Sequence, residues 1–323
     1  VESMEVFKVI GYILLLVAGF VLLVKGADIF VDGASKIAVK CNIPQMVVGL
    51  TIVALGTSAP EAAVSIKAAF AGVADMTVGN VVGSNILNIL LILGMAVLFA
   101  PLPIKKNTLR IDIPLVVVVT LTMFFLGYFD GKLGRFDGVI MYVMLIGFIT
   151  YLIVTAKKGG ADDDSIVITE KDKTWKLILF ILIGAALIVA GSELTVRSAS
   201  FIAGKFGMSD RLISLTIVAF GTSLPELVTS CVAAKKGQAD IAIGNIVGSN
   251  ILNILFVAGT TMLISPVAFN KEFLVDSMVA VLAAVILFAC CVRDKKLTKK
   301  EGIFMLAAYA VYFGYIMVKN YAV

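Results

Sequence analysis

Long apolar stretches alternate with short clusters of Gly, Pro and charged residues along the whole sequence. A transmembrane helix needs roughly 20 apolar residues, and each stretch reaches about that length. The pattern therefore predicts ten membrane-spanning helices, of which the first and sixth are long enough to tilt or to run partly along the interface. The predicted segments are approximately residues 7–39, 45–71, 76–100, 111–129, 136–156, 175–206, 211–234, 240–265, 273–292 and 302–320.

The two halves of the sequence repeat each other at an offset of 165 residues. The stretch LTIVALGTSAPE at 50–61 returns as LTIVAFGTSLPE at 215–226, with ten of twelve residues identical. GNVVGSNILNIL at 79–90 returns as GNIVGSNILNIL at 244–255, with eleven of twelve identical. Each half holds five predicted spans, so the second half enters the membrane from the opposite side. This is the inverted-repeat design of secondary transporters, whose binding sites lie near the bilayer midplane between the halves.

We therefore predict an all-α polytopic membrane protein of two inverted five-helix repeats, with proline-broken helices at its centre. The first repeat covers residues 1–158 and the second covers 175–323, and the linker 159–174 lies between them. Three consecutive aspartates at 162–164 make this linker acidic. They lack the glycine turn and the distal glutamate of a calcium loop. We interpret the linker as a solvated connection, with a regulatory calcium site as the alternative.

Composition agrees with a membrane protein and excludes several kinds of chemistry. Apolar residues make up 60% of the chain and charged residues 15%, against about 45–50% and 25% in soluble domains. The sequence has no histidine, which removes histidine metal ligands, general bases and proton relays. It also has no P-loop nucleotide-binding motif, so no nucleotide is an expected partner. The net charge of +5 comes from loop lysines and indicates membrane topology rather than nucleic-acid binding.

The distribution of basic residues predicts the orientation in the membrane. The loops on one side carry 17 of the 27 lysines and arginines, and those on the other side carry 8. Cytoplasmic loops of membrane proteins carry the excess of basic residues. We therefore expect a multi-pass protein of the cell membrane, with both termini outside and the central linker in the cytoplasm.

Two glutamates at equivalent positions of the repeat are the strongest candidates for a functional site. Glu61 and Glu226 each follow a proline inside an apolar segment. Close helix packing accounts for the small residues of the repeats. It does not account for two ionised carboxylates, which are expensive at membrane depth. We therefore interpret both glutamates as ion-binding groups.

The residues around each glutamate predict a break in the spanning helix. Pro60 has no N–H, and its ring crowds the carbonyl of Gly56. Irregular backbone at membrane depth is tolerated only where it is buried in protein or lines a cavity. Free main-chain carbonyls, the hydroxyls of Thr57 and Ser58 and the carboxylate of Glu61 should then point at one place. The second copy supplies the same groups from the opposite direction through Gly221, Thr222, Ser223, Pro225 and Glu226.

The third and eighth spans add further oxygen ligands. Ser84 and Asn88 are four residues apart and share one helical face, as do Ser249 and Asn253. Every convergent group is an oxygen, so zinc, copper and iron are poor candidates for the bound ion. Calcium takes about six to eight oxygen ligands, and two carboxylates balance its charge. Sodium suits the same oxygens.

The paired GTSxPE and GN-x-VGSN-x-x-N motifs resemble the α-repeats of the cation/calcium antiporter superfamily, which includes sodium/calcium and proton/calcium exchangers. The resemblance covers essentially the whole chain and implies a prokaryotic secondary antiporter whose first and sixth spans are moving gates. It implies that Glu61 and Glu226 bind Ca²⁺ together with the main-chain oxygens of Thr57 and Thr222. It also implies positions for a coupling ion, which are the side chains of Ser58, Ser84, Ser223 and Ser249 and the main-chain oxygens of Ala54 and Ala219.

One departure from the family pattern bears on the coupling ion. Many sodium-coupled members have an acidic residue at one or both of the positions of Asn88 and Asn253, where this sequence has amides. The centre then has two carboxylates, and two protons would balance one Ca²⁺. We therefore predict Ca²⁺/H⁺ exchange, with Na⁺/Ca²⁺ exchange as the alternative because the serines remain.

Two other classes of function fit the sequence less well. A Ca²⁺-permeable channel is the more distant alternative, because broken inverted repeats favour alternating access and channels usually build their pores from several subunits. An intramembrane enzyme would need a nucleophile with a base or an aspartate pair, and neither is present. We expect no cofactor, and we expect a transporter that functions as a monomer in the lipid bilayer with inorganic cations as its partners.

Overall fold

The computed structural model describes residues 2–72, 75–159, 166, 168–170, 172–208 and 213–321. Eight of its helices are long and apolar enough to cross a membrane, and a bent pair of shorter helices makes nine. The difference from the ten predicted spans lies at the seventh segment, 211–234. Residues 211 and 212 are outside the described part of the chain, and the rest of the segment is divided into short helical pieces. The all-helical polytopic fold is confirmed.

The first half of the chain consists of helices, three π-helical segments and two short strands. In chain order they are α1 (Glu2–Lys40), α2 (Gln45–Val48), η1 (Gly49–Val53), α3 (Ala54–Thr57), α4 (Ala59–Phe70), α5 (Asp75–Ile86), η2 (Leu87–Leu93), α6 (Gly94–Phe99), β1 (Leu102–Pro103), η3 (Thr108–Asp112), α7 (Ile113–Asp130), β2 (Lys132–Leu133) and α8 (Arg135–Lys158).

The second half repeats this order at nearly constant offset. Its elements are α9 (Thr174–Lys205), η4 (Ser214–Val218), α11 (Ala219–Gly221), α12 (Leu224–Lys235), α13 (Ala239–Leu252), η5 (Asn253–Ala258), α14 (Gly259–Ile264), β3 (Val267–Ala268), α15 (Lys271–Asp294), β4 (Lys296–Leu297) and α16 (Lys299–Tyr321). The π-helical segments η1 and η4 are equivalent in the two halves, and so are η2 and η5. Hydropathy did not predict them; such segments are frequent at functional sites.

Two antiparallel strand pairs join the halves at opposite ends. Leu102 of β1 pairs with Leu297 of β4, and Leu133 of β2 pairs with Val267 of β3. The repeat offset relates β1 to β3 and β2 to β4, so each pair joins one half to the non-equivalent strand of the other. A pseudo-two-fold axis between the halves exchanges β1 with β3 and β2 with β4, so it converts the β1–β4 pair into the β3–β2 pair. The strand pairing therefore confirms the predicted inverted architecture.

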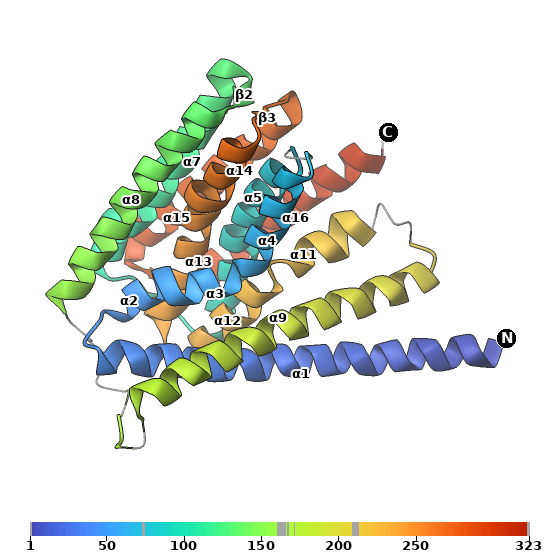
Figure 1. Cartoon of the computed structure of the whole chain (residues 1–323), viewed down its shortest axis with the longest axis horizontal. Coiled ribbons are helices and arrows are strands. Elements are labelled where there is room, and N and C mark those ends of the chain that lie inside the picture. The colour runs from blue at the N-terminus through green and yellow to red at the C-terminus, as the bar shows by residue number, and fades with distance from the viewer. Residues whose placement is uncertain are drawn as a thin grey trace.

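The helices α1 and α9 lie side by side along one edge of the molecule, and helices such as α7, α8 and α15 stand across them (Figure 1). Glycines spaced seven residues apart allow this close contact. A Cβ on Gly26 would lie 2.8 Å from the Cβ of Leu187, and one on Gly191 would lie 2.7 Å from the backbone nitrogen of Leu23. Small residues let membrane helices approach in this way, so α1 and α9 form one closely packed pair.

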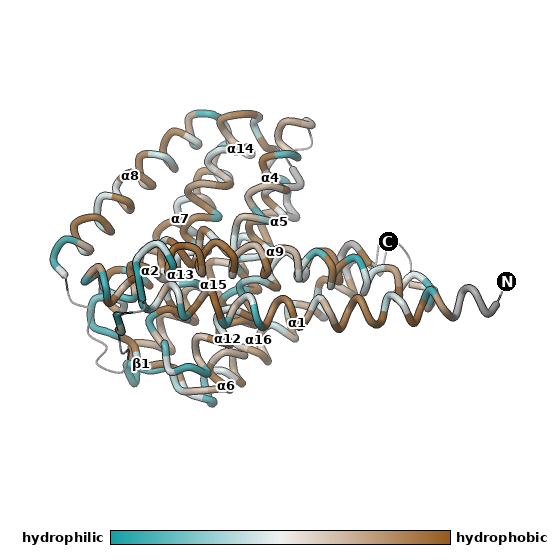
Figure 2. The backbone as a smooth tube through the Cα atoms, turned by 60° about the horizontal axis from the view of Figure 1, so that its bottom comes forward, coloured by the Kyte–Doolittle hydropathy of each residue, from teal (hydrophilic) through white to brown (hydrophobic). Residues whose placement is uncertain are grey.

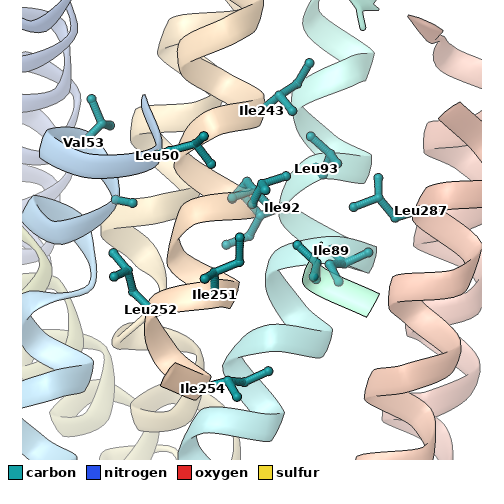
Figure 3. Close-up of a cluster of buried hydrophobic side chains, with 14 of the residues drawn as sticks. Leu50, Val53, Ile89, Ile92, Leu93, Ile243, Ile251, Leu252, Ile254 and Leu287 are labelled. Carbon is teal, nitrogen blue, oxygen red and sulfur yellow. The ribbon is translucent and has the colours of Figure 1, made fainter. Parts of the chain in front are cut away.

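The centre of the molecule is formed by α13 and by the continuous α5–η2–α6 span. In the span Ala239–Ile264, 94% of the apolar residue stretch that would cross the membrane is buried inside the protein. In α1 only 11% of the corresponding stretch is buried. Leu50, Ile92, Ile243 and Ile251 belong to the buried apolar cluster around α13 (Figure 3). Apolar residues also cover the outer surfaces of α1 and α8, where a bilayer would meet them (Figure 2).

The described end of the linker contacts the end of α1. The Lys36 ammonium donates to Asp172 Oδ1 at 2.8 Å, and Lys40 donates to the main-chain oxygen of Asp172. The hydrogen bond from Lys36, together with those from Thr169, holds the pKa of the Asp172 carboxyl well below its usual range. The three aspartates at 162–164 lie outside the described residues.

Candidate ion-binding site

Each repeat contains a broken helix at its centre. In the first, α3 ends at Thr57, Ser58 leaves the helical conformation with ψ of 4°, and α4 begins at Ala59. The segments before and after Ser58 meet at 54°. In the second, Ser223 has ψ of 6° between α11 and α12. In both repeats the proline stands in the first turn of the following helix, where its missing N–H costs no intrahelical bond.

The two glutamates lie in the first turns of these following helices and are buried. Glu61 is 1% exposed in α4, and Glu226 is 0% exposed in α12. The unpaired N–H groups of a helix N-terminus give it a partial positive charge that favours a carboxylate. The helix breaks therefore place each carboxyl at a helix end that partly compensates its charge.

Crossed hydrogen bonds join each glutamate to the serine of the other repeat. The Ser58 hydroxyl donates to Glu226 Oε1 at 2.8 Å, and the Ser223 hydroxyl donates to Glu61 Oε1 at 3.2 Å. Ser249 Oγ of α13 lies 2.8 Å from Ser58 Oγ. The repeat offset relates the first two contacts to each other, so the glutamates and serines surround the pseudo-two-fold axis.

One oxygen of each glutamate carries no hydrogen bond. Glu61 Oε2 and Glu226 Oε2 are both buried without a partner among the described residues. A buried carboxylate oxygen without a partner loses several kcal/mol of hydration. Within the described chain, no group of three or more Asp, Glu or Cys side chains comes together. The arrangement therefore suits a cation or protons held by two carboxyls only.

Buried amides extend the polar centre beyond the glutamates. Asn253 Nδ2 donates to Asn85 Oδ1 at 3.2 Å, and Asn85 Nδ2 donates to the main-chain oxygen of Asn250 at 3.1 Å. Asn88 is 0% exposed, and neither atom of its amide has a partner in the described part of the protein. Asn88 and Asn253 thus keep polar atoms available for an ion or for water.

Asn245 is a site residue that sequence reasoning did not single out. Its Oδ1 accepts from the Thr57 hydroxyl at 2.9 Å, and its Nδ2 donates to Ser230 Oγ at 2.9 Å and to the main-chain oxygen of Glu226 at 3.4 Å. It therefore joins the two broken helices. The signal was present in the sequence, because Asn80 is its identical counterpart in the other repeat.

Ser192 is a second residue that the sequence analysis missed. Its hydroxyl donates to the main-chain oxygen of Gly221 at 2.8 Å, which is the carbonyl that Pro225 cannot bond. The counterpart of Ser192 is Ala27, so the first repeat has no such hydroxyl. The replacement of Ala27 in the first repeat by Ser192 in the second was the sequence difference that could have identified this residue.

Among the described residues, the cavities that reach the candidate site residues lie on the η4 side. Ser84 and Ala219 line a cavity of about 400 Å³ between α5, η4 and α16. Thr222 lines a second cavity of about 450 Å³ together with Pro60, Ser192 and Glu193. The counterparts of Ala219 and Thr222, which are Ala54 and Thr57, are both 0% exposed. A third cavity of about 390 Å³ lies beside η1 and is lined by Val47 and Leu50, but none of the candidate site residues lines it. The candidate site residues are thus reached from the η4 side and buried on the η1 side.

Two aspartates of α1 pair with a lysine that follows α12. Asp28 and Asp32 both accept from the Lys236 ammonium at 2.7 Å. Glu193, which the repeat offset relates to Asp28, pairs with Arg197 one turn along α9 and lines the second cavity.

Comparison with known proteins supports the same interpretation of this geometry. The model of the family described as sodium/calcium exchanger protein matches residues 11–154 and 176–318, one match for each repeat. The chain belongs to the sodium/calcium exchanger family. It is therefore a multi-pass membrane transporter that exchanges calcium with another cation, and it is not an enzyme.

Relatives of this exchanger match over nearly their whole length. The putative antiporter CaxA of Alkalimonas amylolytica is 42% identical over 310 residues, which cover 91% of this chain and 95% of CaxA. The sodium/calcium exchanger MaX1 of Methanosarcina acetivorans is 31% identical, with 93% and 96% covered. The solved sodium-calcium exchanger NCX_Mj superposes with a TM-score of 0.82 at 31% identity, with 95% and 98% covered.

Replacing Asn245 by Leu should weaken Ca²⁺ binding by about tenfold, because a buried hydrogen-bond partner lost from Thr57 and Ser230 costs about 1–3 kcal/mol. Asn270→Leu is the control, because Asn270 is exposed at the start of α15 and is not among the candidate site residues. Calorimetric Ca²⁺ titration of both purified variants measures the difference. Equal Ca²⁺ affinities would contradict the role of Asn245.

Proposed function

We propose that this exchanger moves Ca²⁺ in exchange for H⁺ by alternating access, with Glu61 and Glu226 binding both ions in turn. The observation that carries the proposal is the pair of buried carboxyls with one unpartnered oxygen each. Two carboxyls hold either one Ca²⁺ or two protons, and the site is neutral in both states. Moving one elementary charge through the membrane potential costs about 2.3 kcal/mol per 100 mV. A site that is neutral with either ion bound avoids this cost when it changes the side to which it is open.

The proposed Ca²⁺ ligands are the free oxygens at the two helix breaks. Glu61 Oε2 and Glu226 Oε2 supply the charge, and the main-chain oxygens of Thr57 and Thr222 complete a ring from both repeats. Calcium accepts about six to eight oxygen ligands in flexible geometry. The amide oxygens of Asn88 and Asn253, which have no partner in the described chain, are available for the remaining positions or for their waters.

Two protons are a sufficient driving force for calcium export. A pH difference of one unit acting on two protons supplies about 2.7 kcal/mol. A tenfold gradient corresponds to about 1.4 kcal/mol, so this supply supports roughly a hundredfold Ca²⁺ gradient. The amides at positions 88 and 253 leave the centre with only two carboxyls, which fits two protons better than three sodium ions.

Sodium is the alternative counter-ion, and two relatives favour it. MaX1 and NCX_Mj are sodium/calcium exchangers by name. A sodium site here would use Ser58, Ser84, Ser223 and Ser249 with the main-chain oxygens of Ala54 and Ala219. The Ser58 and Ser223 hydroxyls donate to the glutamates and keep oxygen lone pairs for a cation, so the preference for protons rests on the two-carboxyl centre and not on the serines.

Calcium flux into proteoliposomes distinguishes the two counter-ions. At clamped voltage, a pH gradient without sodium should drive Ca²⁺ uptake, and a sodium gradient at equal pH should not. The ratio of Ca²⁺ to acid equivalents moved should be about one to two, because each carboxyl carries one proton. Uptake under the sodium gradient alone would overturn proton coupling and establish the alternative.

Neutralising either glutamate should abolish transport. Glu61→Gln and Glu226→Gln each leave bound Ca²⁺ with half of its counter-charge in a buried site, which costs several kcal/mol. We expect Ca²⁺ flux to fall by at least about a hundredfold while the purified variants keep the elution profile of the unsubstituted protein. Glu193→Gln is the matched control, because Glu193 is exposed and pairs with Arg197. Near-normal flux in either site variant would disprove the proposed ligands.

We propose that both termini are outside the cell and that the linker is cytoplasmic. The excess of basic residues in the loops on the linker side supports this orientation. In this orientation, the cavities beside η4 face the outside of the cell. In a background without the four native cysteines, a cysteine at position 132 should react with an impermeant thiol reagent only from outside. One at position 163 should react only from the cytoplasm. Reversed labelling would reverse the orientation.

A further inference from the structure

The cavity of about 390 Å³ beside η1 lies on the linker side of the molecule. It stands where α8 ends at Lys158 and where the span Thr108–Asp130 begins, so it lies at the level of a membrane surface. We call it the interface cavity. The lining residues that matter here are Val47, Leu50, Lys106, Tyr151, Thr155 and Lys158.

The polar wall of the interface cavity contains two ammonium groups without a counter-charge. Lys106 stands just before η3, and Lys158 is the last residue of α8. Both lysines line the cavity and are exposed. Within the described part of the chain, neither forms an ion pair with a carboxylate. Two lysines from separate elements therefore face one cavity with their charges available to an anion.

The acidic groups that line the interface cavity already have partners. The Lys105 ammonium lies 2.8 Å from Asp240 Oδ2, so these two opposite charges balance. Asp112 is 1% exposed, and it accepts a hydrogen bond from the Tyr151 hydroxyl at 2.9 Å. The exposed charges that remain at the cavity are therefore those of the two lysines.

The rest of the lining is largely apolar. Met46, Val47 and Leu50, from α2 and η1, line the cavity. On the outer surface of α8, the neighbouring Ile153 and Val154 are exposed, where a bilayer would meet them. The cavity thus combines apolar residues with ammonium groups beside a lipid-facing helix. A phospholipid, whose phosphate is joined to a glycerol with apolar chains, matches both parts of this lining, whereas inorganic phosphate matches only one.

The two crossed strand pairs differ in charge, although the repeats are equivalent. The loops joined by β1 and β4, residues 104–110 and 293–300, carry eight basic residues and one acidic residue. Those joined by β2 and β3, residues 130–137 and 265–272, carry three of each. Basic clusters directly beside the cytoplasmic ends of spans attract anionic lipids. The charge around the interface cavity therefore favours an anionic headgroup at this end of the bundle.

We propose that the interface cavity binds the headgroup of an anionic phospholipid. The ammonium groups of Lys106 and Lys158 donate charge-assisted hydrogen bonds to its phosphate oxygens. Its glycerol lies against Val47 and Leu50. A zwitterionic phospholipid has the same phosphate but also a cationic group, which the two lysines repel. The site therefore selects a headgroup of net negative charge and brings the lipid into contact with η1, which leads to the first helix break.

Lys106→Gln combined with Lys158→Gln tests the site by lipid binding. Each lysine near an anionic headgroup contributes a factor of about five to binding. We therefore expect the double variant to bind phosphatidylglycerol about thirtyfold more weakly than the unsubstituted protein. Native mass spectrometry of the purified proteins with added phosphatidylglycerol measures the bound fraction. Phosphatidylcholine is the zwitterionic comparison, and equal binding of the two lipids by the unsubstituted protein would contradict the proposal.

The matched control removes two positive charges at the other end of the bundle. Lys132 and Arg135 are exposed in the loop joined to β3, and Lys132→Gln combined with Arg135→Gln should leave phosphatidylglycerol binding unchanged. Equal losses in the two double variants would show general charge attraction only and would overturn the site. Lys106→Arg combined with Lys158→Arg keeps both charges and should keep binding. A thirtyfold loss in this variant as well would also disprove the charged contact.

Soluble glycerol 3-phosphate distinguishes a lipid from a free phosphate ester. It carries the phosphate and the glycerol without the apolar chains, so at equal concentration it should not displace phosphatidylglycerol from the unsubstituted protein. Displacement at equal concentration would identify the ligand as a soluble phosphate and overturn the lipid. These measurements contain no transported ion, so their outcome is independent of the counter-ion of the exchanger.

Discussion

The structure depends on the burial of two carboxyls at the centre of the helix bundle. Glu61 and Glu226 are buried at the centre of a membrane protein, and a carboxylate there must be balanced by a cation or neutralised by a proton. The surroundings supply only partial compensation, through the helix ends at Ala59 and Leu224 and one serine hydroxyl for each glutamate. In the function proposed above, the remaining oxygens bind the transported ions. A site that was fully satisfied by the protein would bind nothing, so the incomplete hydrogen bonding is the property that function requires.

Inverted duplication is the simplest way to build such a site. A single broken helix provides one carboxyl, a hydroxyl and a few carbonyls on one side of the ion, which is too few ligands for calcium. The second copy provides the same set from the opposite direction. Each glutamate is hydrogen-bonded by the serine of the other half, Ser58 to Glu226 and Ser223 to Glu61. Neither half alone therefore forms one of these serine–glutamate pairs. The two crossed strand pairs at the ends of the bundle keep the halves in register.

Much of this arrangement can be predicted from sequence because its causes are local. The apolar runs, the offset of the repeats and the prolines beside Glu61 and Glu226 predict the fold, the inversion and the helix breaks. The π-helical segments, the strand pairs and the contacts of Asn245 cannot be predicted in this way, because they depend on which helices meet in space. Asn80 and Asn245 are identical in sequence, yet Asn80 bonds Ser65 within its own repeat and Asn245 also bonds Thr57 of the other.

The difference between Asn80 and Asn245 follows from the state of the molecule, which sequence does not determine. Opening on both sides at once would make a channel. This structure is open on one side, so equivalent residues have two environments: Ala54 is buried and Ala219 is exposed. The equivalence of the repeats is incomplete, because Gly49, whose Cα lies against Gly244, corresponds to Ser214 in the second repeat. The near-identity of the two motifs therefore leaves the environment of each residue to be decided by how the helices meet in space.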